Sequence, residues 1–305
     1  MRLADDGAQI PVEIAPRSSL TVPASSPEKV DKSKGSPADE VVLDLEDAVV
    51  PSEKEGARNA LAEALSSSTW TPITSVRINA PRTAWCHTDV IVIASLPNAP
   101  ATLIVPKVES VGDLQFIDRL LDGIELAYGR SRPIRTQALI ENARGLSRVD
   151  EIAACSERLE GLIIGYADLA ASLGRTPTGA SDIGAWDSVR TTVLTAARAN
   201  GLHAIDGPYL GIRPDDAFYD EARRARNLGF DGKWAIHPSQ VEALNELFSP
   251  TADEIADAAR IVATLKTAEA EHQAGAVVLD GRMLDKAVEV AALRVLERAK
   301  VSNGG

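Results

Sequence analysis

The chain has 305 residues, 45% of them hydrophobic, which is enough for one large folded core. It carries 32 lysines and arginines against 44 aspartates and glutamates, and its formal net charge of −12 argues against general binding to nucleic acids or to anionic membranes. The two cysteines, Cys86 and Cys155, are too few and too far apart for a disulfide framework. With no signal-like start and no apolar run of membrane-spanning length, we expect a cytoplasmic protein.

Short apolar runs alternate along the chain with stretches of helical composition and period. The apolar runs predict strands at 18–23, 40–47, 75–80, 102–109, 136–142, 161–168, 203–209 and 233–238. The stretches between them predict helices, among them 52–66, 111–126, 144–155, 187–200 and 215–228. Eight strands, each followed by a helix, predict an α/β protein whose parallel sheet closes into a (β/α)₈ TIM barrel. An open, doubly wound sheet is the alternative.

The sequence beyond the last predicted strand exceeds what a barrel needs. It predicts a helix at 250–274, a short hairpin or loop at 275–285 and an amphipathic helix at 286–300. The apolar side of the last helix consists of Val288, Ala291, Ala292, Val295 and Leu296. We therefore expect an N-terminal extension at 1–16, a barrel catalytic domain at 17–249 and a C-terminal helix and lid segment at 250–305.

Ionic residues gather where the apolar runs end. They are Asp44 and Glu46, Arg77 with Asn79, Lys107 with Glu109, Glu141, and Asp168. The C-terminal ends of the strands carry the active site in barrels of this kind, so these side chains predict a site at that end. One or two of them could instead be polar only because a strand meets solvent there.

Glu141 and Asp168 end neighbouring strands of the predicted barrel. Two inward carboxylates repel each other unless a cation or a proton lies between them. Carboxylate oxygens together with water and substrate oxygens suit Mg²⁺. The four histidines have no zinc-like spacing, so zinc is a weaker candidate. For either acid alone, an ordinary salt bridge stays open as well.

Arg77 lies in sequence between the acids of the second run and the ionic residues of the fourth. A buried arginine needs carboxylate partners, and Asp44 and Glu46 are predicted to supply them. Arg77 would then offer fixed donors to a developing negative charge such as an enolate oxygen. By strand alternation, Asp47 is expected on the opposite face, pairing locally.

A basic cluster follows the first predicted strand. Lys29, Lys32 and Lys34 lie in "SSPEKVDKSKG", and Arg17 begins the strand itself. Such a cluster above the mouth of an acidic protein could hold phosphate groups, or it could be an ordinary solvated helix face.

The motifs together resemble a known family, the citrate lyase β-subunit-like branch of the HpcH/HpaI aldolase superfamily, which includes malyl-CoA and citramalyl-CoA lyases. The resemblance runs from about Arg17 to Lys300. It is carried by "RSSLTVPASSPEKVDKS", "VVLDLEDAVVPSEKEGAR", "VRINAP", "VPKVES", "LIENARG", "GYADLAASLG" and "GFDGKWAIHPSQVEALNELFSP". It implies a Mg²⁺-dependent barrel that acts on a coenzyme A thioester and a small oxoacid, and a homotrimer or a hexamer.

The resemblance also implies roles for single residues. Arg77 corresponds to the arginine that contacts the reacting oxoacid or enolate, and the acids of "DLED" to those that hold it. Glu141 and Asp168 correspond to the metal ligands, and Glu141 also borders the substrate. The coenzyme A-contacting segment corresponds to Arg17, Lys29 and Lys32.

The tail "GAVVLDGRMLDKAV" resembles the lid of malyl-CoA and citramalyl-CoA lyases. The resemblance implies that Asp285 reaches the active site of an adjacent subunit as acid or base. Asp285 could also be the N-cap of the last helix, and both roles are compatible. Two departures leave the acyl substrate open: Asn142 stands where threonine is commoner, and "VPASS" lacks the usual Gly-Asp or Gly-Asn.

These points predict a reversible carbon–carbon lyase of the Claisen type. Its substrate would be a 3-hydroxyacyl-CoA such as malyl-CoA or citramalyl-CoA, cleaved to glyoxylate or pyruvate and a shorter acyl-CoA. A malate-synthase-like or thioesterase-like reaction could instead result at the same site. Three further functions stay open: a citrate lyase β-like subunit that acts on a carrier-bound citryl thioester, a non-catalytic binding protein, and a CoA-independent hydroxy-oxoacid aldolase.

Overall fold

The structure, a computed structural model, describes residues 15–67, 69–175, 184–272 and 276–302. The chain divides into two compact units, Met1–Asn245 and Glu246–Gly305. The division falls four residues before the boundary predicted between the barrel and the C-terminal segment. The first unit contains the barrel, and the second is built from two helices and a hairpin.

A closed barrel of eight parallel strands in chain order forms the first unit, as predicted. The strands are β1 Ser18–Pro23, β2 Glu40–Asp44, β3 Ile73–Arg77, β4 Thr102–Val105, β5 Arg135–Ile140, β6 Leu159–Ile164, β7 His203–Asp206 and β8 Gly232–Ala235. All but the first end two to four residues earlier than predicted. The ionic residues that follow each apolar run therefore lie mainly in the loops at the C-terminal end of the barrel, which we call the mouth.

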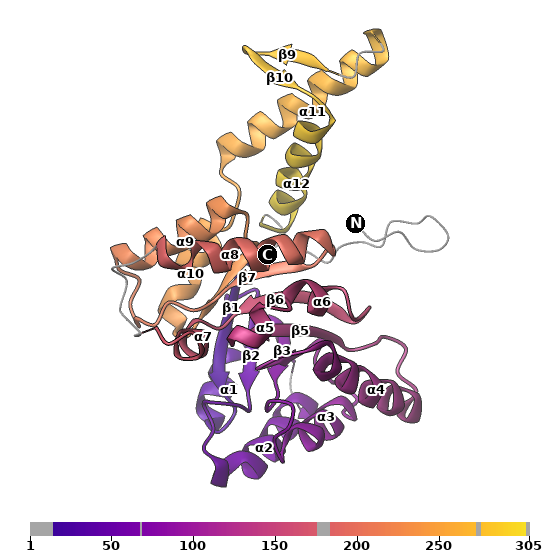
Figure 1. Cartoon of the computed structure of the whole chain (residues 1–305), viewed down its shortest axis with the longest axis vertical. Coiled ribbons are helices and arrows are strands. Elements are labelled where there is room, and N and C mark those ends of the chain that lie inside the picture. Colours follow the sequence, from indigo (N-terminus) through magenta and orange to yellow (C-terminus); the bar gives the residue numbers. More distant parts are fainter. Residues whose placement is uncertain (1–14, 68, 176–183, 273–275, 303–305) are drawn as a thin grey trace. The chain divides into compact units, whose positions relative to one another are not determined.

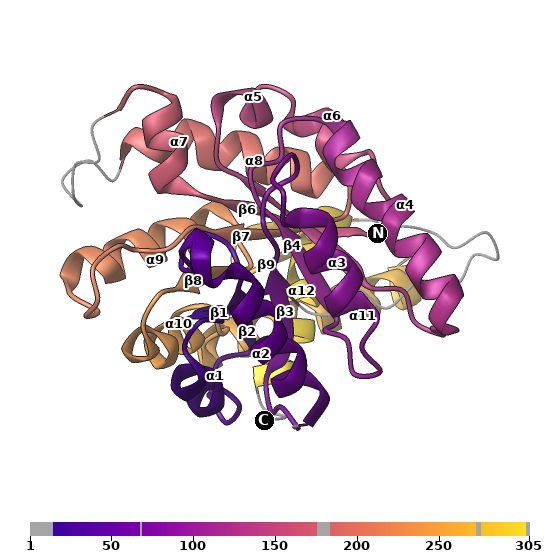
Figure 2. The same cartoon turned by 90° about the horizontal axis from the view of Figure 1, so that it is seen from below.

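Helices of the first unit lie around its strands, as the view in Figure 2 shows. They are α1 Pro27–Ser33, α2 Lys54–Ser67, α3 Cys86–Ala94, α4 Val111–Tyr128, α5 Ala143–Leu146, α6 Val149–Ala153, α7 Tyr166–Ser172, α8 Asp187–Ala199, α9 Asp216–Leu228 and α10 Val241–Leu247. Short 3₁₀ turns, η1 Pro51–Glu53 and η3 Pro238–Gln240, precede α2 and α10. The single helix predicted at 144–155 is two short ones, and the end of the strand predicted at 161–168 is the start of α7.

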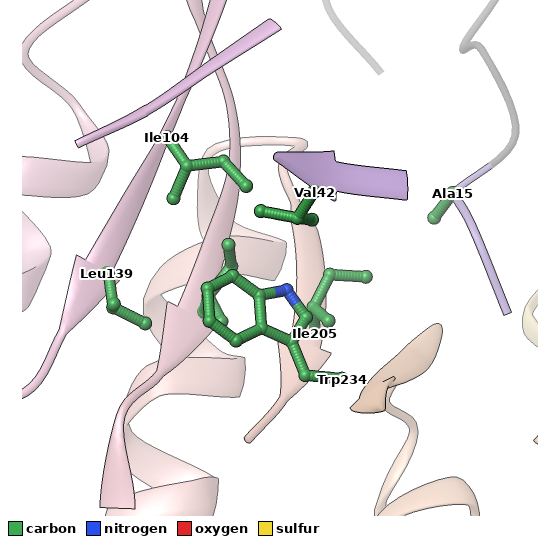
Figure 3. Packing of buried hydrophobic residues seen from close by; sticks show 7 residues of the cluster. Ala15, Val42, Ile104, Leu139, Ile205 and Trp234 are labelled. Carbon is green, nitrogen blue, oxygen red and sulfur yellow. The ribbon is translucent and has the colours of Figure 1, made fainter. Parts of the chain in front are cut away.

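The barrel interior is filled by side chains that alternate along the strands. Its apolar layer consists of Ala15, Val42, Ile104, Leu139, Ile163, Ile205 and Trp234, and each is at most 7% exposed. The indole of Trp234 lies in the middle of this layer (Figure 3). Ala15 belongs to the predicted extension at 1–16, so its last residues are part of the core. Residues 1–14 lie outside the described residues.

The chain leading into β1 passes tightly against β8. A Cβ placed on Gly232 would come within 2.0 Å of the Pro16 carbonyl oxygen. Only glycine leaves room for this approach. The contact closes the barrel at the N-terminal ends of its strands.

The second unit is a helical hairpin whose two helices lie side by side (Figure 1). It consists of α11 Ala252–His272, β9 Val277–Leu279, β10 Arg282–Leu284 and α12 Lys286–Ser302, and the two strands pair antiparallel. Its apolar core joins residues of α11 to Leu284 and Ala292, with Val288, Val295 and Leu296 packed against it. The prediction for the apolar side of the last helix is wrong at Ala291, which is exposed. Among the described helices, none is long and apolar enough to cross a membrane.

Candidate active site

Asp44 and Arg77 end neighbouring strands and face each other in register across β2 and β3. The guanidinium donates from Nε to Asp44 Oδ1 at 2.7 Å and from Nη2 to Asp44 Oδ2 at 2.6 Å. Asp44 also accepts the backbone N–H groups of Glu46 at 2.8 Å and Ala48 at 3.1 Å. Asp44 is fully buried, and its carboxylate fixes both the arginine and the loop that follows β2.

Glu46 is the second acid beside the arginine. Its Oε2 lies 3.0 Å from Arg77 Nη1, and its Oε1 accepts from Lys107 Nζ at 2.5 Å. Burial raises the pKa of Glu46, while Arg77 and Lys107 oppose that rise. The predicted pairing of Arg77 with both Asp44 and Glu46 is present in the structure.

Lys107 joins the separate parts of the site. Its backbone N–H donates to Glu141 Oε1 at 2.7 Å, and its ammonium lies 3.1 Å from Asp47 Oδ1 and 3.5 Å from Asp168 Oδ2. Its φ of 52° is in the left-handed region, which a lysine rarely adopts. Burial lowers the pKa of Lys107, but Glu46 and Asp47 outweigh this, so it is raised and the ammonium stays charged.

The sequence predicts Lys107 as a polar residue at a strand end and assigns it no role. The signal was its position directly after the apolar run of β4, inside "VPKVES". What the sequence could not supply is the convergence of loops from three different strands on one ammonium.

The prediction that Asp47 points away from the site is wrong. It assumed a strand through residue 47, whereas β2 ends at Asp44 and strand alternation stops there. In the loop, Asp47 turns back and its carboxylate accepts from Lys107. We call residues 44–47, which include Asp44, Glu46 and Asp47, the acidic turn.

Glu141 follows β5 and is 3% exposed. Its Oε1 is held by the Lys107 N–H, and a Cβ on Gly165 would lie 2.7 Å from its Oε2. Glycine at 165 therefore keeps a space open beside this oxygen. Burial raises the pKa of Glu141 to about 8, helped by Glu46 and Asp168 and opposed by Arg77 and Lys107.

Asp168 lies in the first turn of α7 and not, as predicted, at the end of a strand. Its side chain is 43% exposed, and its carboxylate shares Lys107 with Glu46 and Asp47. The turn at the end of β6 brings it to the mouth beside Glu141, because Gly165 begins α7 directly after that strand.

The donor set fits a magnesium ion better than a softer metal. Glu141 and Asp168 offer hard carboxylate oxygens, and Gly165 leaves space at Glu141 Oε2. Within the described part of the chain, no group of three or more His, Cys, Asp and Glu is arranged to hold a metal. A bound ion would thus need oxygens from water or substrate as well, which is usual for Mg²⁺.

The predicted coenzyme A segment is divided by the structure. Arg17 precedes β1 and Asp39 precedes β2, so both lie at the end of the barrel opposite the mouth. The two form a bidentate pair with distances of 2.8 and 2.7 Å. The prediction that Arg17 contacts the substrate with the mouth residues is therefore wrong in position. Arg17 lies at the start of the first apolar run. In a parallel barrel, the starts of the strands lie at the end opposite the mouth.

Lys29 and Lys32 lie on α1, which follows β1 on the mouth side. Both are exposed, and Lys32 pairs with Glu28 at 2.7 Å. Asn142 accepts from the Gly145 N–H at 2.8 Å and caps α5, so its carbonyl is occupied by the fold.

In the second unit, Asp285 accepts the Val288 N–H at 3.1 Å and is the N-cap of α12. The cap fixes one carboxylate oxygen, Oδ1. The cap is observed in the structure, and the role in a neighbouring active site stays a prediction.

Known proteins of similar sequence show the family. The HpcH/HpaI aldolase/citrate lyase family model matches residues 17–238. The chain is 36% identical over 286 residues to the L-malyl-CoA/beta-methylmalyl-CoA lyase of Cereibacter sphaeroides, covering 88% of this chain and 90% of that one. It is 37% identical over 290 residues to the citrate lyase subunit beta of Haemophilus influenzae, covering 93% and 97%.

Among solved structures, the chain resembles the protein CitE from Mycobacterium tuberculosis in complex with magnesium, acetoacetate and coenzyme A. The TM-score is 0.75 with 33% identity, covering 94% of this chain and 99% of that one. The predictions of a TIM barrel, of the family and of a lyase are confirmed. The chain belongs to the HpcH/HpaI aldolase/citrate lyase family.

Proposed function

We propose that this enzyme is a magnesium-dependent lyase for a 3-hydroxyacyl-CoA such as malyl-CoA or citramalyl-CoA. The products would be an oxoacid, glyoxylate or pyruvate, and a shorter acyl-CoA, in a reversible reaction. The observation that carries the proposal is the convergence of Arg77, Glu141 and Asp168 at the mouth. Arg77 shares Glu46 with Lys107, and Lys107 contacts both Glu141 and Asp168. The names of the relatives support thioester and oxoacid substrates, and the magnesium in the CitE complex supports the metal.

Glu141 and Asp168 would hold the ion. When bound, it supplies positive charge for the oxygens of the hydroxy acid and of the oxoacid formed from it. Arg77 has five N–H donors, and Asp44 and Glu46 engage only part of them. The rest can bind a substrate carboxylate or the thioester oxygen as it gains negative charge. Because Asp44 fixes the guanidinium on two sides, little reorganisation is needed during the reaction.

In the cleavage direction, a base takes the hydroxyl proton of the carbinol. The bond between the carbinol carbon and the α-carbon of the thioester then breaks, and its electron pair forms the thioester enolate. An acid returns a proton to the α-carbon. We propose Asp285 of a neighbouring subunit as this base and acid, in a homotrimer or hexamer, because the tail that carries it resembles the lid of malyl-CoA and citramalyl-CoA lyases.

A second candidate is a carrier-dependent citrate lyase β-like subunit. It is favoured by the Haemophilus influenzae relative, which matches over 97% of its own length. Such a subunit would leave free coenzyme A esters untouched and would act on a citryl thioester of its carrier protein. The lysines of α1 would then meet the carrier and not a free nucleotide.

The proposal is tested by a turnover panel with the purified protein and Mg²⁺. Malyl-CoA, methylmalyl-CoA, citramalyl-CoA and 3-hydroxy-3-methylglutaryl-CoA are offered, and products are identified by mass spectrometry with and without chelator. Chelator-sensitive formation of a shorter acyl-CoA and an oxoacid supports the lyase. Free coenzyme A in place of acyl-CoA indicates a thioesterase or synthase outcome. No reaction with any ester by folded, metal-loaded protein would favour the carrier-dependent subunit.

A further inference from the structure

Lys54, the first residue of α2, is a buried lysine that the proposed reaction does not use. Its ammonium donates to the carbonyl oxygens of Leu45 at 2.8 Å and Glu46 at 2.7 Å. It also lies 5.5 Å from the centre of the Trp85 ring. Among the described residues, no carboxylate forms an ion pair with this ammonium. Such an arrangement is unusual for a lysine that is only 6% exposed.

The two carbonyls belong to the acidic turn. Its backbone N–H groups are already held, because Leu45 N–H donates to the Arg77 carbonyl at 2.9 Å and Glu46 N–H donates to Asp44. Lys54 holds the same two residues from the carbonyl side. The peptide groups around Glu46 are thus fixed on both sides.

Glu46 needs this support. Although its Oε2 lies near Arg77, that oxygen is buried and makes no hydrogen bond in the described structure. Among the described residues, Lys107 alone donates a hydrogen bond to its carboxylate, and the Lys107 side chain is 37% exposed. The position of the carboxylate therefore depends on its backbone as well as on these two cations.

The positive charge of Lys54 also stabilises the acidic turn. Three carboxylates follow one another within four residues of the acidic turn, while Arg77 and Lys107 approach them at the mouth. Lys54 adds a positive charge from α2. Burial lowers the pKa of Lys54, and Asp44 and Glu46 oppose this, so the acids stabilise its charged form.

We propose that Lys54 is a positioning residue of the reaction, which holds Glu46 in place and through it Arg77 and Lys107. The inference rests on the proposed role of Arg77. It would act without touching substrate or metal, because its contacts are the backbone of the acidic turn and the Trp85 ring.

The test is a double-mutant cycle of Lys54→Met with Glu46→Gln, followed by kcat and KM on the active thioester. Lys54→Met is expected to lower kcat about 10- to 100-fold and to change KM less than about threefold. In the Glu46→Gln background, the same change should cost less than about threefold, because Glu46 is what Lys54 positions. Lys54→Arg, which keeps a cationic donor, should recover much of kcat.

Lys233→Met is the matched control. Lys233 is also buried, but its ammonium contacts Asp206 and the Gly207 carbonyl, each at 2.6 Å, and not the acidic turn. The fold-losses in kcat caused by Lys233→Met and by Glu46→Gln should multiply in the double variant, as expected for independent sites. If Lys54→Met also multiplies with Glu46→Gln, or lowers only thermal stability, the inference is overturned.

A second measurement needs no turnover. A double-mutant cycle of Glu46→Gln and Lys107→Met is measured through the unfolding equilibrium constant, which gives the coupling between the two side chains. The cycle is run once with lysine and once with methionine at position 54. The coupling should fall by about threefold or more with methionine, and an unchanged coupling would overturn the inference. If the wild type cleaves no thioester, the proposed function fails while this measurement still decides the role of Lys54.

Discussion

The two ends of the barrel both bury charged residues, yet they arrange them differently. At the N-terminal end, Arg17 pairs with Asp39 in one bidentate geometry, and Glu40 accepts from the hydroxyl groups of Ser19 and Ser75. At the mouth, Lys107 is shared among three carboxylates at distances from 2.5 to 3.5 Å. The first end is closed by fixed pairs, and the second leaves donors and acceptors incompletely used.

This difference follows from the roles that barrels give to their two ends. A charge with a dedicated partner contributes to stability and has nothing left for a ligand. A cation shared by several acids leaves carboxylate oxygens that can bind another cation. Charge removal should therefore affect turnover at the mouth and stability at the other end.

The largest effect is expected at the proposed metal ligands. Glu141→Gln and Asp168→Asn should each lower kcat about 1,000-fold or more and weaken Mg²⁺ binding, because each removes a carboxylate ligand. Calorimetric titration with Mg²⁺ and circular dichroism check binding and folding. Asn142→Ala is a neighbouring control that should retain Mg²⁺ binding. Variants that turn over and bind the ion normally would remove Glu141 and Asp168 from the site.

Arg77→Lys should come next, with a loss of about 100- to 1,000-fold in kcat. Lysine keeps the charge but cannot reproduce the two parallel bonds to Asp44. Steady-state kinetics with the active thioester measures the loss, and Mg²⁺ affinity should stay within about threefold of the wild type. Equal activity of the lysine variant would show that the fork geometry is not needed.

Substitutions of Asp285 can distinguish its role as the N-cap of α12 from its proposed role as acid and base. Asp285→Asn keeps a good N-cap and should retain thermal stability while losing turnover, whereas Asp285→Ala should also lose about 1 kcal/mol of stability. Mixed oligomers of Asp285→Ala and Arg77→Ala chains should regain activity if the residue serves a neighbouring subunit. Full activity of Asp285→Asn would exclude the acid–base role.

At the opposite end, Arg17→Met should lower the unfolding free energy by about 2 kcal/mol and leave kcat of the folded protein unchanged. Loss of the bidentate pair leaves Asp39 half-buried without its guanidinium. Chemical denaturation and kinetics on the same samples measure both quantities. A lowered kcat with normal stability would instead make Arg17 a substrate contact.

The smallest effect concerns the two thiols. Burial raises the pKa of Cys86 to about 12 and that of Cys155 to about 11. Both thiols therefore stay protonated at pH 8, and modification by a thiol reagent should be about 100-fold slower than for an unfolded chain, rising as the pH approaches 11. A rate equal to that of the denatured protein would contradict this.

Much of the fold was predictable because local apolar runs and turn residues determine where the strands and helices lie. All eight barrel strands and the C-terminal hairpin were predictable. The errors concern strand ends: extending β2 through residue 47 reversed the face of Asp47, and extending β6 put Asp168 on a strand. Side-chain alternation gives the wrong face once a strand has become a loop.

The site was predictable only in part. Asp44, Arg77 and Glu141 lie at or directly after strand ends, where a one-dimensional pattern is informative. The role of Lys107 depends on its positive φ and on three loops that meet in space. Local sequence composition predicts neither feature. Arg17 directly precedes β1, and the start of a parallel strand lies at the end of the barrel away from the mouth, so the position implied by the resemblance does not fit the strand direction.

The most direct test of the mouth as the active site is a crystal structure of the protein with Mg²⁺ and pyruvate or glyoxylate. We predict an ion bound by Glu141 and Asp168, with the oxoacid beside Arg77 and the ammonium of Lys107 withdrawn from Asp168. An ion held elsewhere, or an oxoacid away from Arg77, would contradict the assignment of the mouth as the active site.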